Sequence, residues 1–174
     1  VDTSMGLTPL EGLMMGTRSG DIDAGAVTYL MDKFNLDTKG ISDLLNKKSG
    51  LAGVSEASSD FRDILAGIAA GNDKARLAKE MYMYRIKKYI GAYAAAMNGL
   101  DVLVFTGGIG ENDTYIREQI CKGLTYLGVD VDYELASQVH GEEKMISTAQ
   151  SKIKVCVIPT DEEIMIAKDT VALL

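Results

Sequence analysis

Two short apolar runs, each followed at once by a chain reversal and a helical pattern, most constrain what this chain can fold into. The first run covers residues 101–105 and the second covers residues 154–159. Continuous apolar runs of this length are typical of strands that are buried on both faces of a sheet. Helical patterns follow them over residues 116–127 and from Thr160 to the end of the sequence. Strand–turn–helix repetition of this kind predicts an α/β fold.

The rest of the chain is predicted to be mainly helical. Apolar residues that recur every three to four positions predict helices over residues 21–35, 41–47, about 61–71, about 74–97 and 132–138. Gly53 is expected in a loop after the second of these helices. Residues 1–17 contain two apolar stretches that are interrupted by turn residues, which predicts a hairpin or a strand–turn–strand unit.

Length and charge narrow the possible functions. The 174 residues are 47% apolar and 25% charged, as in a soluble globular domain. The net charge of −7 gives no electrostatic footprint for a nucleic acid or an anionic membrane. No apolar run approaches the roughly 18 residues that a membrane span needs. We therefore expect neither a nucleic acid nor a membrane as partner.

The cysteine and histidine content argues against a metal-thiolate or Cys-His site. Cys121 and Cys156 are the only cysteines and lie far apart in the sequence, which is typical of reduced core residues in a cytosolic protein. His140 is the only histidine and lies in a polar stretch, which favours a surface position over a catalytic one. One histidine and two separated cysteines are too few for a zinc site.

The reversal after the first apolar run is rich in glycine. Residues 106–112 read Thr-Gly-Gly-Ile-Gly-Glu-Asn. Glycines permit positive φ and let the backbone approach a ligand closely, and the amides of a following helix favour an anion. The alternative is a plain tight turn in which Asn112 or Asp113 caps the next helix. The pattern alone leaves both interpretations open.

The reversal after the second run is rich in acid. Thr160 and Glu163 have the spacing of a capping box, with Thr160 as the N-cap. This assignment leaves Asp161 and Glu162 without a structural role. A free carboxylate at the end of a strand is a possible Mg²⁺ ligand, usually through water. Because parallel strands present their carboxyl ends at one edge of a sheet, both reversals are expected to face one cleft.

Two further segments carry candidate functional residues. Arg18 lies between Gly16 and Gly20, where it is a solvated charge, a partner of Asp21, or a cation that meets a transferring phosphoryl group. In the segment 59–62, an aromatic ring and a guanidinium could flank an adenine while Asp60 contacts a ribose. Asp60 is equally suitable as the N-cap of the helix that follows.

Residues 2–23, which run from Asp-Thr-Ser-Met-Gly-Leu-Thr-Pro to Gly-Thr-Arg-Ser-Gly-Asp-Ile-Asp, closely resemble a signature segment of the acetate and propionate kinase family. Residues 105–112 resemble the adenosine loop of this family, and the segments 59–62 and 159–163 follow in the family order. The resemblance covers essentially the whole chain.

The resemblance implies an actin-like, sugar-kinase-like ATPase fold with two ribonuclease-H-like domains around a cleft. Residues 1–174 would be most of the second, C-terminal nucleotide-binding domain, without the N-terminal domain, and the final helix at about 161–174 would normally pack on that absent domain. The implied activity is reversible phosphoryl transfer between ATP and acetate by a cytoplasmic homodimer. Propionate as the acceptor, or a non-catalytic nucleotide-binding or dimerising module, are the alternatives, and the isolated chain is expected to be inactive.

Site residues follow from the matching motifs. Arg18 is implied as the transition-state stabiliser and Glu162 as the residue linked to Mg²⁺. The implied contacts to ATP or ADP are Asp60, Phe61, Arg62, Gly108, Ile109, Gly110, Glu111 and Asn112. The catalytic histidine of the family has no counterpart here, and neither do its asparagine, second arginine and catalytic aspartate. The chain is therefore expected to hold part of an active site.

Overall fold

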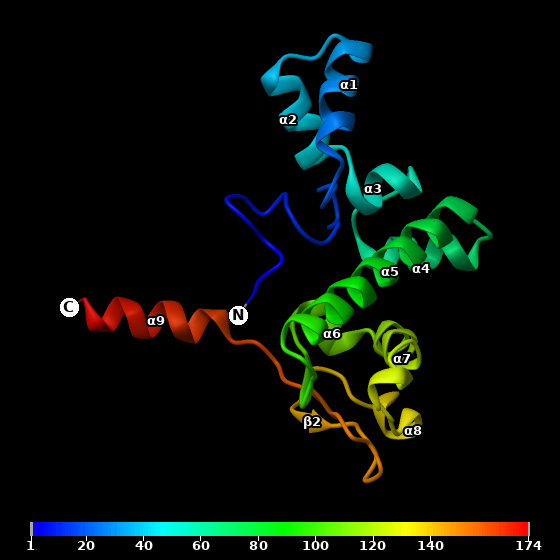
Figure 1. Ribbon diagram of the computed structural model, residues 1–174, viewed down its shortest axis with the longest axis vertical. Coiled ribbons are helices and arrows are strands. Elements are labelled where there is room, and N and C mark those ends of the chain that lie inside the picture. The colour runs from blue at the N-terminus through cyan, green and yellow to red at the C-terminus, as the bar shows by residue number, and fades with distance from the viewer. Residues whose placement is uncertain (1, 174) are drawn as a thin grey trace. The chain divides into compact units, whose positions relative to one another are not determined.

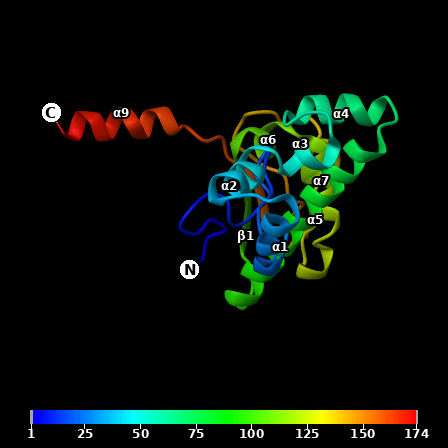
Figure 2. The same cartoon turned by 90° about the horizontal axis from the view of Figure 1, so that it is seen from above.

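The computed structural model describes residues 2–173, which divide into two compact units. The first unit ends at Tyr93 and the second begins at Ala94, so the division falls within the long helix α5 (Asp73–Ala96). Figures 1 and 2 show the elements of both units, coloured along the chain. Within the described residues, no helix is both long enough and apolar enough to span a membrane.

The first unit is helical. Its helices are α1 (Ala24–Phe34), α2 (Thr38–Lys47), α3 (Gly50–Ser55), α4 (Phe61–Ala69) and α5, and α1 packs beside α2 (Figure 1). Asp23, Asp37 and Asp60 are the N-caps of α1, α2 and α4, and each accepts a hydrogen bond from an amide of the first turn. These caps satisfy amides that have no partner within the helix, which explains where the helices begin. The helices predicted for this region are confirmed.

Two predictions for the first unit are wrong. The described part of the region 1–17 forms bends and turns and contains no strand. Its backbone bonds to the ends of helices instead, as in the bond from Leu51 N to Met15 O. Gly53 lies inside α3 rather than in a loop. A small apolar cluster, formed by Met14, Leu51 and Ala78, joins this region to α3 and α5.

The second unit contains a three-stranded sheet. Its strands are β1 (Val102–Phe105), β2 (Lys144–Met145) and β3 (Lys154–Val157), in the order β1-β3-β2. β1 pairs parallel with β3, and β2 pairs antiparallel with β3. The remaining elements are α6 (Gly107–Asn112), α7 (Thr114–Lys122), a 3₁₀ turn (Thr125–Leu127), α8 (Tyr133–Ala136) and α9 (Glu162–Ala172). Both predicted strands are confirmed, and a two-residue strand such as β2 leaves no periodic signal.

Burial differs between the two predicted strands. Val155, Cys156 and Val157 of β3 are buried, as expected. In β1, Val102 and Val104 are each 44% exposed, so the expectation of burial on both faces is wrong for this strand. β1 lies at the edge of the sheet, and its alternate residues point away from the packed side. Cys121 and Cys156 are both free and buried, which confirms their core positions.

The ends of the two strands also depart from the predictions. The expected turn at 106–112 contains the short helix α6. The capping box at the start of α9 is wrong, because Asp161 is the N-cap and accepts a hydrogen bond of 2.9 Å from Ile164 N. The hydroxyl of Thr160 bonds to Glu111 instead, so a tertiary contact outweighs the local motif. α9 has no buried residue and extends away from the sheet of its unit (Figures 1 and 2).

Candidate functional site

Arg18 lies in a tight loop of the first unit, residues 15–19, which we call the arginine loop. Met15 N donates to Arg18 O at 3.0 Å and closes the loop. Ser19 N donates to Leu45 O at 2.9 Å and joins the loop to the end of α2. The loop therefore has a defined backbone path although it belongs to no helix or strand.

The guanidinium of Arg18 has no carboxylate partner in the described part of the chain. Its recorded polar contact is from Nη1 to the thioether sulfur of Met15, at 3.6 Å. Pairing with Asp21, one of the alternatives from the sequence, does not occur, because Asp21 Oδ2 accepts from Arg85 Nη2 at 2.6 Å and from Tyr89 Oη at 2.5 Å. A half-buried guanidinium without a counter-ion keeps its donors available for an anion.

The network that occupies Asp21 is also what keeps it ionised. Burial raises the pKa of Asp21. Hydrogen bonds from Tyr89 and from Gly12 N lower this pKa by a larger amount, so the net shift is downward. The same contact and burial raise the pKa of Tyr89 to about 12. Asp21 therefore stays charged opposite Arg85 and leaves Arg18 unpaired.

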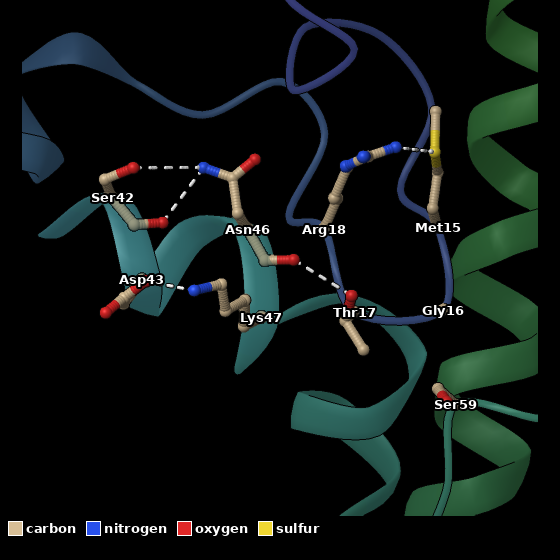
Figure 3. A pocket seen from close by; sticks show the side chains of 9 residues that line it. All are labelled: Met15, Gly16, Thr17, Arg18, Ser42, Asp43, Asn46, Lys47 and Ser59. Carbon is tan, nitrogen blue, oxygen red and sulfur yellow. Dashed lines mark hydrogen bonds and ion pairs between the residues drawn. The ribbon is translucent and has the colours of Figure 1, made fainter.

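A cavity of about 790 Å³ opens beside the arginine loop. Its lining consists of Met15, Gly16, Thr17, Arg18, Ser42, Asp43, Asn46, Lys47 and Ser59 (Figure 3). Lys47 is paired with Asp43 at 2.7 Å, so Arg18 is the cation of this lining that lacks an ion pair within residues 2–173. Ser59 contributes the rim next to Gly16, where a Cβ built on Gly16 would lie 3.0 Å from Ser59 O. The cavity thus brings Arg18 next to the start of the segment 59–62.

Asp60 and Arg62 form a forked ion pair at the start of α4. Arg62 Nη2 donates to Asp60 Oδ2 at 2.6 Å and Arg62 Nε donates to Oδ1 at 3.1 Å. Arg62 N also donates to Oδ1 at 2.8 Å, which confirms Asp60 as an N-cap. The side-chain hydrogen bonds from Arg62, and then its amide, lower the pKa of Asp60 to about 2. The pair places the guanidinium of Arg62 on the surface next to the start of α4.

Phe61 points into the unit rather than toward Arg62. Its ring packs on Tyr82 with centroids 5.7 Å apart, and it borders the Met14–Leu51–Ala78 cluster. The predicted pair of flanking groups for an adenine is therefore split, with the Phe61 ring partly buried against Tyr82 and the Arg62 side chain 89% exposed. Contacts of these residues with a nucleotide remain a prediction.

The glycine-rich segment 107–112, which we call the glycine loop, leaves part of its backbone uncovered. Gly107 has φ 71, and a Cβ built on Gly107 or Gly108 would meet no atom within 4 Å. Gly110 differs, since its Cβ would lie 3.3 Å from the backbone of Phe105. Asn112 Nδ2 donates to Gly108 O at 3.0 Å and closes the turn. One side of the loop is thus open to a ligand and the other rests on the end of β1.

Glu111 joins the two chain reversals. Its Oε1 accepts hydrogen bonds from Thr160 N and Gly107 N, both at 2.8 Å, and from Thr160 Oγ1 at 3.0 Å. The bond from the Thr160 amide is the main cause of a lowered pKa for Glu111. This link shows that the reversals after the two strands lie side by side, while the expectation that both face one cleft stays a prediction. The sequence suggested Glu111 only as a nucleotide contact and gave no sign of the link.

Arg117 supports the glycine loop from the buried side, a role that was not predicted from the sequence. It is 1% exposed, and its guanidinium donates to Gly110 O, Glu111 O, Ala136 O and Val139 O at 2.6 to 3.1 Å. Burial lowers its pKa. A signal was present, because Arg117 has helical spacing with the apolar Ile120 and Cys121 and so lies on the face that points to the core.

His140, exposed as expected, contacts Asn112 O at 3.2 Å.

Glu162 is the candidate metal ligand of the second unit. It lies exposed in the first turn of α9 next to the N-cap Asp161, and its carboxylate has no recorded partner within residues 2–173. No group of three or more His, Cys, Asp or Glu side chains comes together as a metal site in the same residues. Mg²⁺ in phosphoryl-transfer enzymes commonly takes one or two carboxylates, waters and substrate phosphates. An uncommitted, water-accessible carboxylate fits this kind of binding.

Comparison with known proteins identifies the family. The model of the acetokinase family matches residues 1–168. The chain belongs to the acetokinase family. It is similar over its whole length to the acetate kinase of Bacteroides thetaiotaomicron, with 62% identity over 174 residues, which are 44% of that protein. The chain therefore spans less than half the length of the curated relatives that it matches.

Solved structures show the same relationship. The crystal structure of Porphyromonas gingivalis acetate kinase matches 99% of this chain with 55% identity and a TM-score of 0.94, over 43% of its own length. A propionate kinase from Francisella tularensis matches 96% of the chain with 43% identity and a TM-score of 0.87, over 42% of its length. The resemblance stated from the motifs is confirmed, and so is the α/β, actin-like fold class that it implied.

Proposed function

We propose that this acetokinase chain forms one part of an active site that transfers the γ-phosphoryl group of ATP to acetate, giving acetyl phosphate and ADP, and runs in reverse. The observation that carries the proposal is the guanidinium of Arg18, which lines an open cavity on a well-held loop and has no counter-ion in the described residues. The membership of the chain in the acetokinase family supports phosphoryl transfer as the class of reaction. The remaining length found in the relatives would supply the rest of the site.

The proposed chemistry is a direct in-line displacement. A carboxylate oxygen of acetate forms a bond to the γ-phosphorus while the bond between this phosphorus and the β,γ-bridging oxygen breaks, and ADP leaves with that oxygen. Negative charge spreads over the three equatorial oxygens in the transition state. Arg18 would neutralise this charge with donors that no counter-ion occupies within the described residues.

The nucleotide is proposed to lie against the glycine loop. The open backbone at Gly107 and Gly108 supports this placement, because an adenosine needs space where a side chain would otherwise stand. We propose Gly108, Ile109, Gly110, Glu111 and Asn112, together with Asp60, Phe61 and Arg62, as ATP and ADP contacts. Glu162 would hold Mg²⁺ through a bound water, and the bound ion would offset phosphate charge. A cytoplasmic homodimer belongs to the same proposal.

The test uses what we call the completed enzyme, in which this chain replaces the matching segment of the Bacteroides thetaiotaomicron relative. We expect it to form acetyl phosphate from acetate and Mg-ATP, and we expect Arg18→Ala to lower kcat sharply. An unchanged kcat in the variant would refute the role of Arg18. Size-exclusion chromatography with light scattering checks the expected dimer.

Two alternatives are distinguished by the same material. The 43% identity to a propionate kinase keeps propionate as a possible acceptor, and the ratio of kcat/KM for acetate and propionate decides between them. Because the chain spans 44% of its relatives' length, the isolated chain is expected to act only as a nucleotide-binding module. Calorimetric titration with Mg-ADP tests binding, and any acetyl phosphate made by the isolated chain would contradict this expectation.

A further inference from the structure

We propose that Gly50 is a positioning residue for Arg18, because the absence of a side chain at this position lets the arginine loop rest directly on the start of α3. The inference rests on the proposed function, in which Arg18 meets the transferring phosphoryl group. Gly50 does not itself line the cavity beside Arg18, so it is not proposed as a ligand-binding residue. Its effect on the reaction would pass through the backbone of the arginine loop.

The start of α3 lacks an ordinary cap. Ser49 is the N-cap residue, but its side chain makes no capping hydrogen bond. The carbonyls of the arginine loop accept from the amides instead, with Ser49 N to Thr17 O at 3.0 Å, Leu51 N to Met15 O at 2.9 Å and Ala52 N to Gly16 O at 2.9 Å. Amides at a helix start need such acceptors from outside the helix. The arginine loop is therefore the cap of α3, and its three carbonyls fix its distance from the helix.

Gly50 stands where this contact is closest. Its φ is 63, and a Cβ built there would lie 2.2 Å from Met15 O, 2.7 Å from Arg18 O and 3.0 Å from Arg18 N. All three atoms belong to the backbone, so no side-chain rotation can relieve the overlap. Any residue with a Cβ at this position must push the arginine loop away from α3, and it must also adopt a left-handed conformation.

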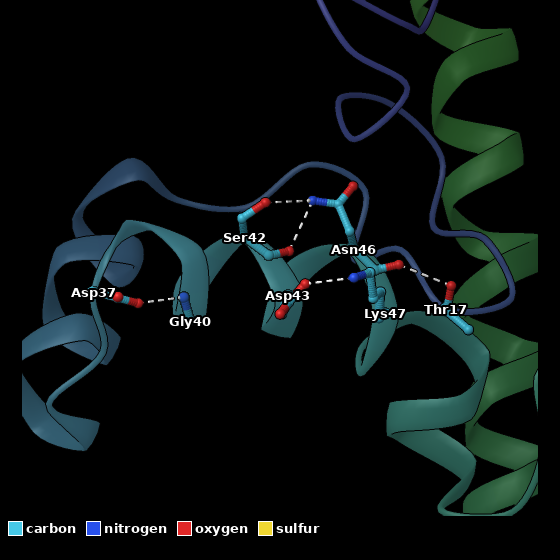
Figure 4. A network of polar contacts seen from close by, with 7 residues as sticks. All are labelled: Thr17, Asp37, Gly40, Ser42, Asp43, Asn46 and Lys47. Carbon is cyan, nitrogen blue, oxygen red and sulfur yellow. Dashed lines mark hydrogen bonds and ion pairs between the residues drawn. The ribbon is translucent and has the colours of Figure 1, made fainter.

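The end of α2 holds the other side of the arginine loop. Thr17 Oγ1 donates to Asn46 O at 2.9 Å, as Figure 4 shows, and Ser19 N donates to Leu45 O. The side chain of Arg18 has only the long contact to the Met15 sulfur. Since its own side chain is held so weakly, the position of the guanidinium depends on the backbone between α2 and α3. A shift of this backbone moves Arg18 directly.

The first measurement compares Gly50→Ala with Gly71→Ala in the completed enzyme. Gly71 also has a left-handed φ of 84, but a Cβ built there would meet nothing within 4 Å, so this control carries the conformational cost without the displaced loop. We expect Gly50→Ala to lower kcat by about 100-fold, the loss that a shift of about 1 Å in a catalytic group can cause. The KM for ATP should change by less than about threefold, since the lost interaction acts in the transition state. Gly71→Ala should keep the parent kcat.

The decisive measurement is a double-mutant cycle. If Gly50 acts through Arg18, then Gly50→Ala combined with Arg18→Ala has the kcat of Arg18→Ala alone. Multiplied losses, or a parent kcat in Gly50→Ala, would overturn the inference while leaving the role of Arg18 intact. A parent kcat in Arg18→Ala would instead overturn both the proposed role of Arg18 and this inference.

A milder variant covers the case in which Gly50→Ala does not fold. Thr17→Val keeps the shape of the side chain and removes only the hydrogen bond to Asn46 O. We expect a loss in kcat of roughly threefold to tenfold, as for one hydrogen bond of about 1 kcal/mol, and no further loss when it is added to Arg18→Ala. An unchanged kcat, or a loss that multiplies with that of Arg18→Ala, would overturn the inference.

Discussion

The arginine loop of the first unit and the glycine loop of the second are held in opposite ways. The arginine loop is held mainly by backbone bonds to the ends of α2 and α3, with one side-chain bond from Thr17 Oγ1 to Asn46 O, and the side chain of Arg18 is left unpaired. The glycine loop is held by side chains, since Glu111 and Arg117 bond to its backbone, and it leaves open space at Gly107 and Gly108. Each loop thus keeps free the group that it would offer to a ligand, which is the Arg18 side chain in one loop and the open backbone in the other.

This difference indicates which kind of contact each loop can offer to a ligand. A charge delivered by a side chain requires a backbone that does not move, so amides and carbonyls are used for support. A ligand that rests on the backbone itself requires glycines without neighbours, so support must come from side chains that reach in from elsewhere. The two loops belong to different compact units. The contacts named above that support each loop come from its own unit.

The largest expected effect comes from removing the free charge. Arg18→Ala in the completed enzyme should lower kcat by about 10²–10³-fold, as for loss of one preorganised donor to a transition-state charge. Nucleotide affinity should change little. Steady-state kinetics with acetate and Mg-ATP, together with titration of Mg-ADP, measures both.

A matched control separates this charge from charge in general. Arg76 is also on the first unit, but it is exposed and already paired with Asp73 at 2.8 Å. Arg76→Ala should keep kcat within about twofold, because exposed pairs contribute little. Equal losses in the two variants would break the distinction between a free and a paired arginine.

The next largest effect is on the support of the glycine loop. Arg117→Met in the completed enzyme should lower the free energy of unfolding by roughly 3 kcal/mol, because several buried carbonyls lose their donor. Chemical denaturation monitored by circular dichroism gives the value. Arg117→Lys should be intermediate, since it keeps the charge and loses the fork. A loss below about 1 kcal/mol in Arg117→Met would show that other contacts hold the loop.

A smaller effect is expected from filling the open side of the glycine loop. Gly108→Val should weaken Mg-ADP binding about tenfold, or about 1.4 kcal/mol, without loss of stability, because its Cβ has free space in the folded chain. Gly110→Val should show the opposite pattern, since its Cβ would press on the backbone of Phe105. Calorimetric titration and thermal unfolding of both variants test the contrast. Unchanged ADP binding in Gly108→Val would remove the open backbone from the proposed site.

The smallest effect is a pH dependence of the link between the two reversals. The pKa of Glu111 is lowered in the folded chain from its ordinary value of 4.5. Its stabilising contribution is therefore fully present above this ordinary value and is lost as the pH falls through the lower folded pKa. Glu111→Gln should lower the unfolding temperature most at neutral pH, and the difference from the parent should shrink in acid.

The control for this measurement is an acid without such a role. Glu142 is exposed, so Glu142→Gln should leave the pH profile of the unfolding temperature unchanged. If Glu111→Gln also left it unchanged, the hydrogen bonds from Thr160 would not stabilise the folded state.

Local sequence signals located most elements and failed where a distant partner competes. Asp60 was predicted as an N-cap, and it caps α4 because its partner amide is only two residues away. Thr160 was predicted as the N-cap of α9 from the same kind of local pattern, but the amide and the hydroxyl of Thr160 both donate hydrogen bonds to Glu111. The hairpin expected near the N-terminus failed for the same reason, since the carbonyls of residues 15–17 accept hydrogen bonds from the start of α3.

The sequence by itself determined the α/β class, the two parallel strands, the family and the residue types of the candidate site, because these depend on periodicity and on motifs that are continuous along the chain. Only the tertiary structure decided that Asp21 is taken by Arg85, that Arg18 stays unpaired, and that Gly50 must lack a side chain. The physical reason is that pairing and close approach depend on distances between segments far apart in the sequence, and no local pattern encodes such distances.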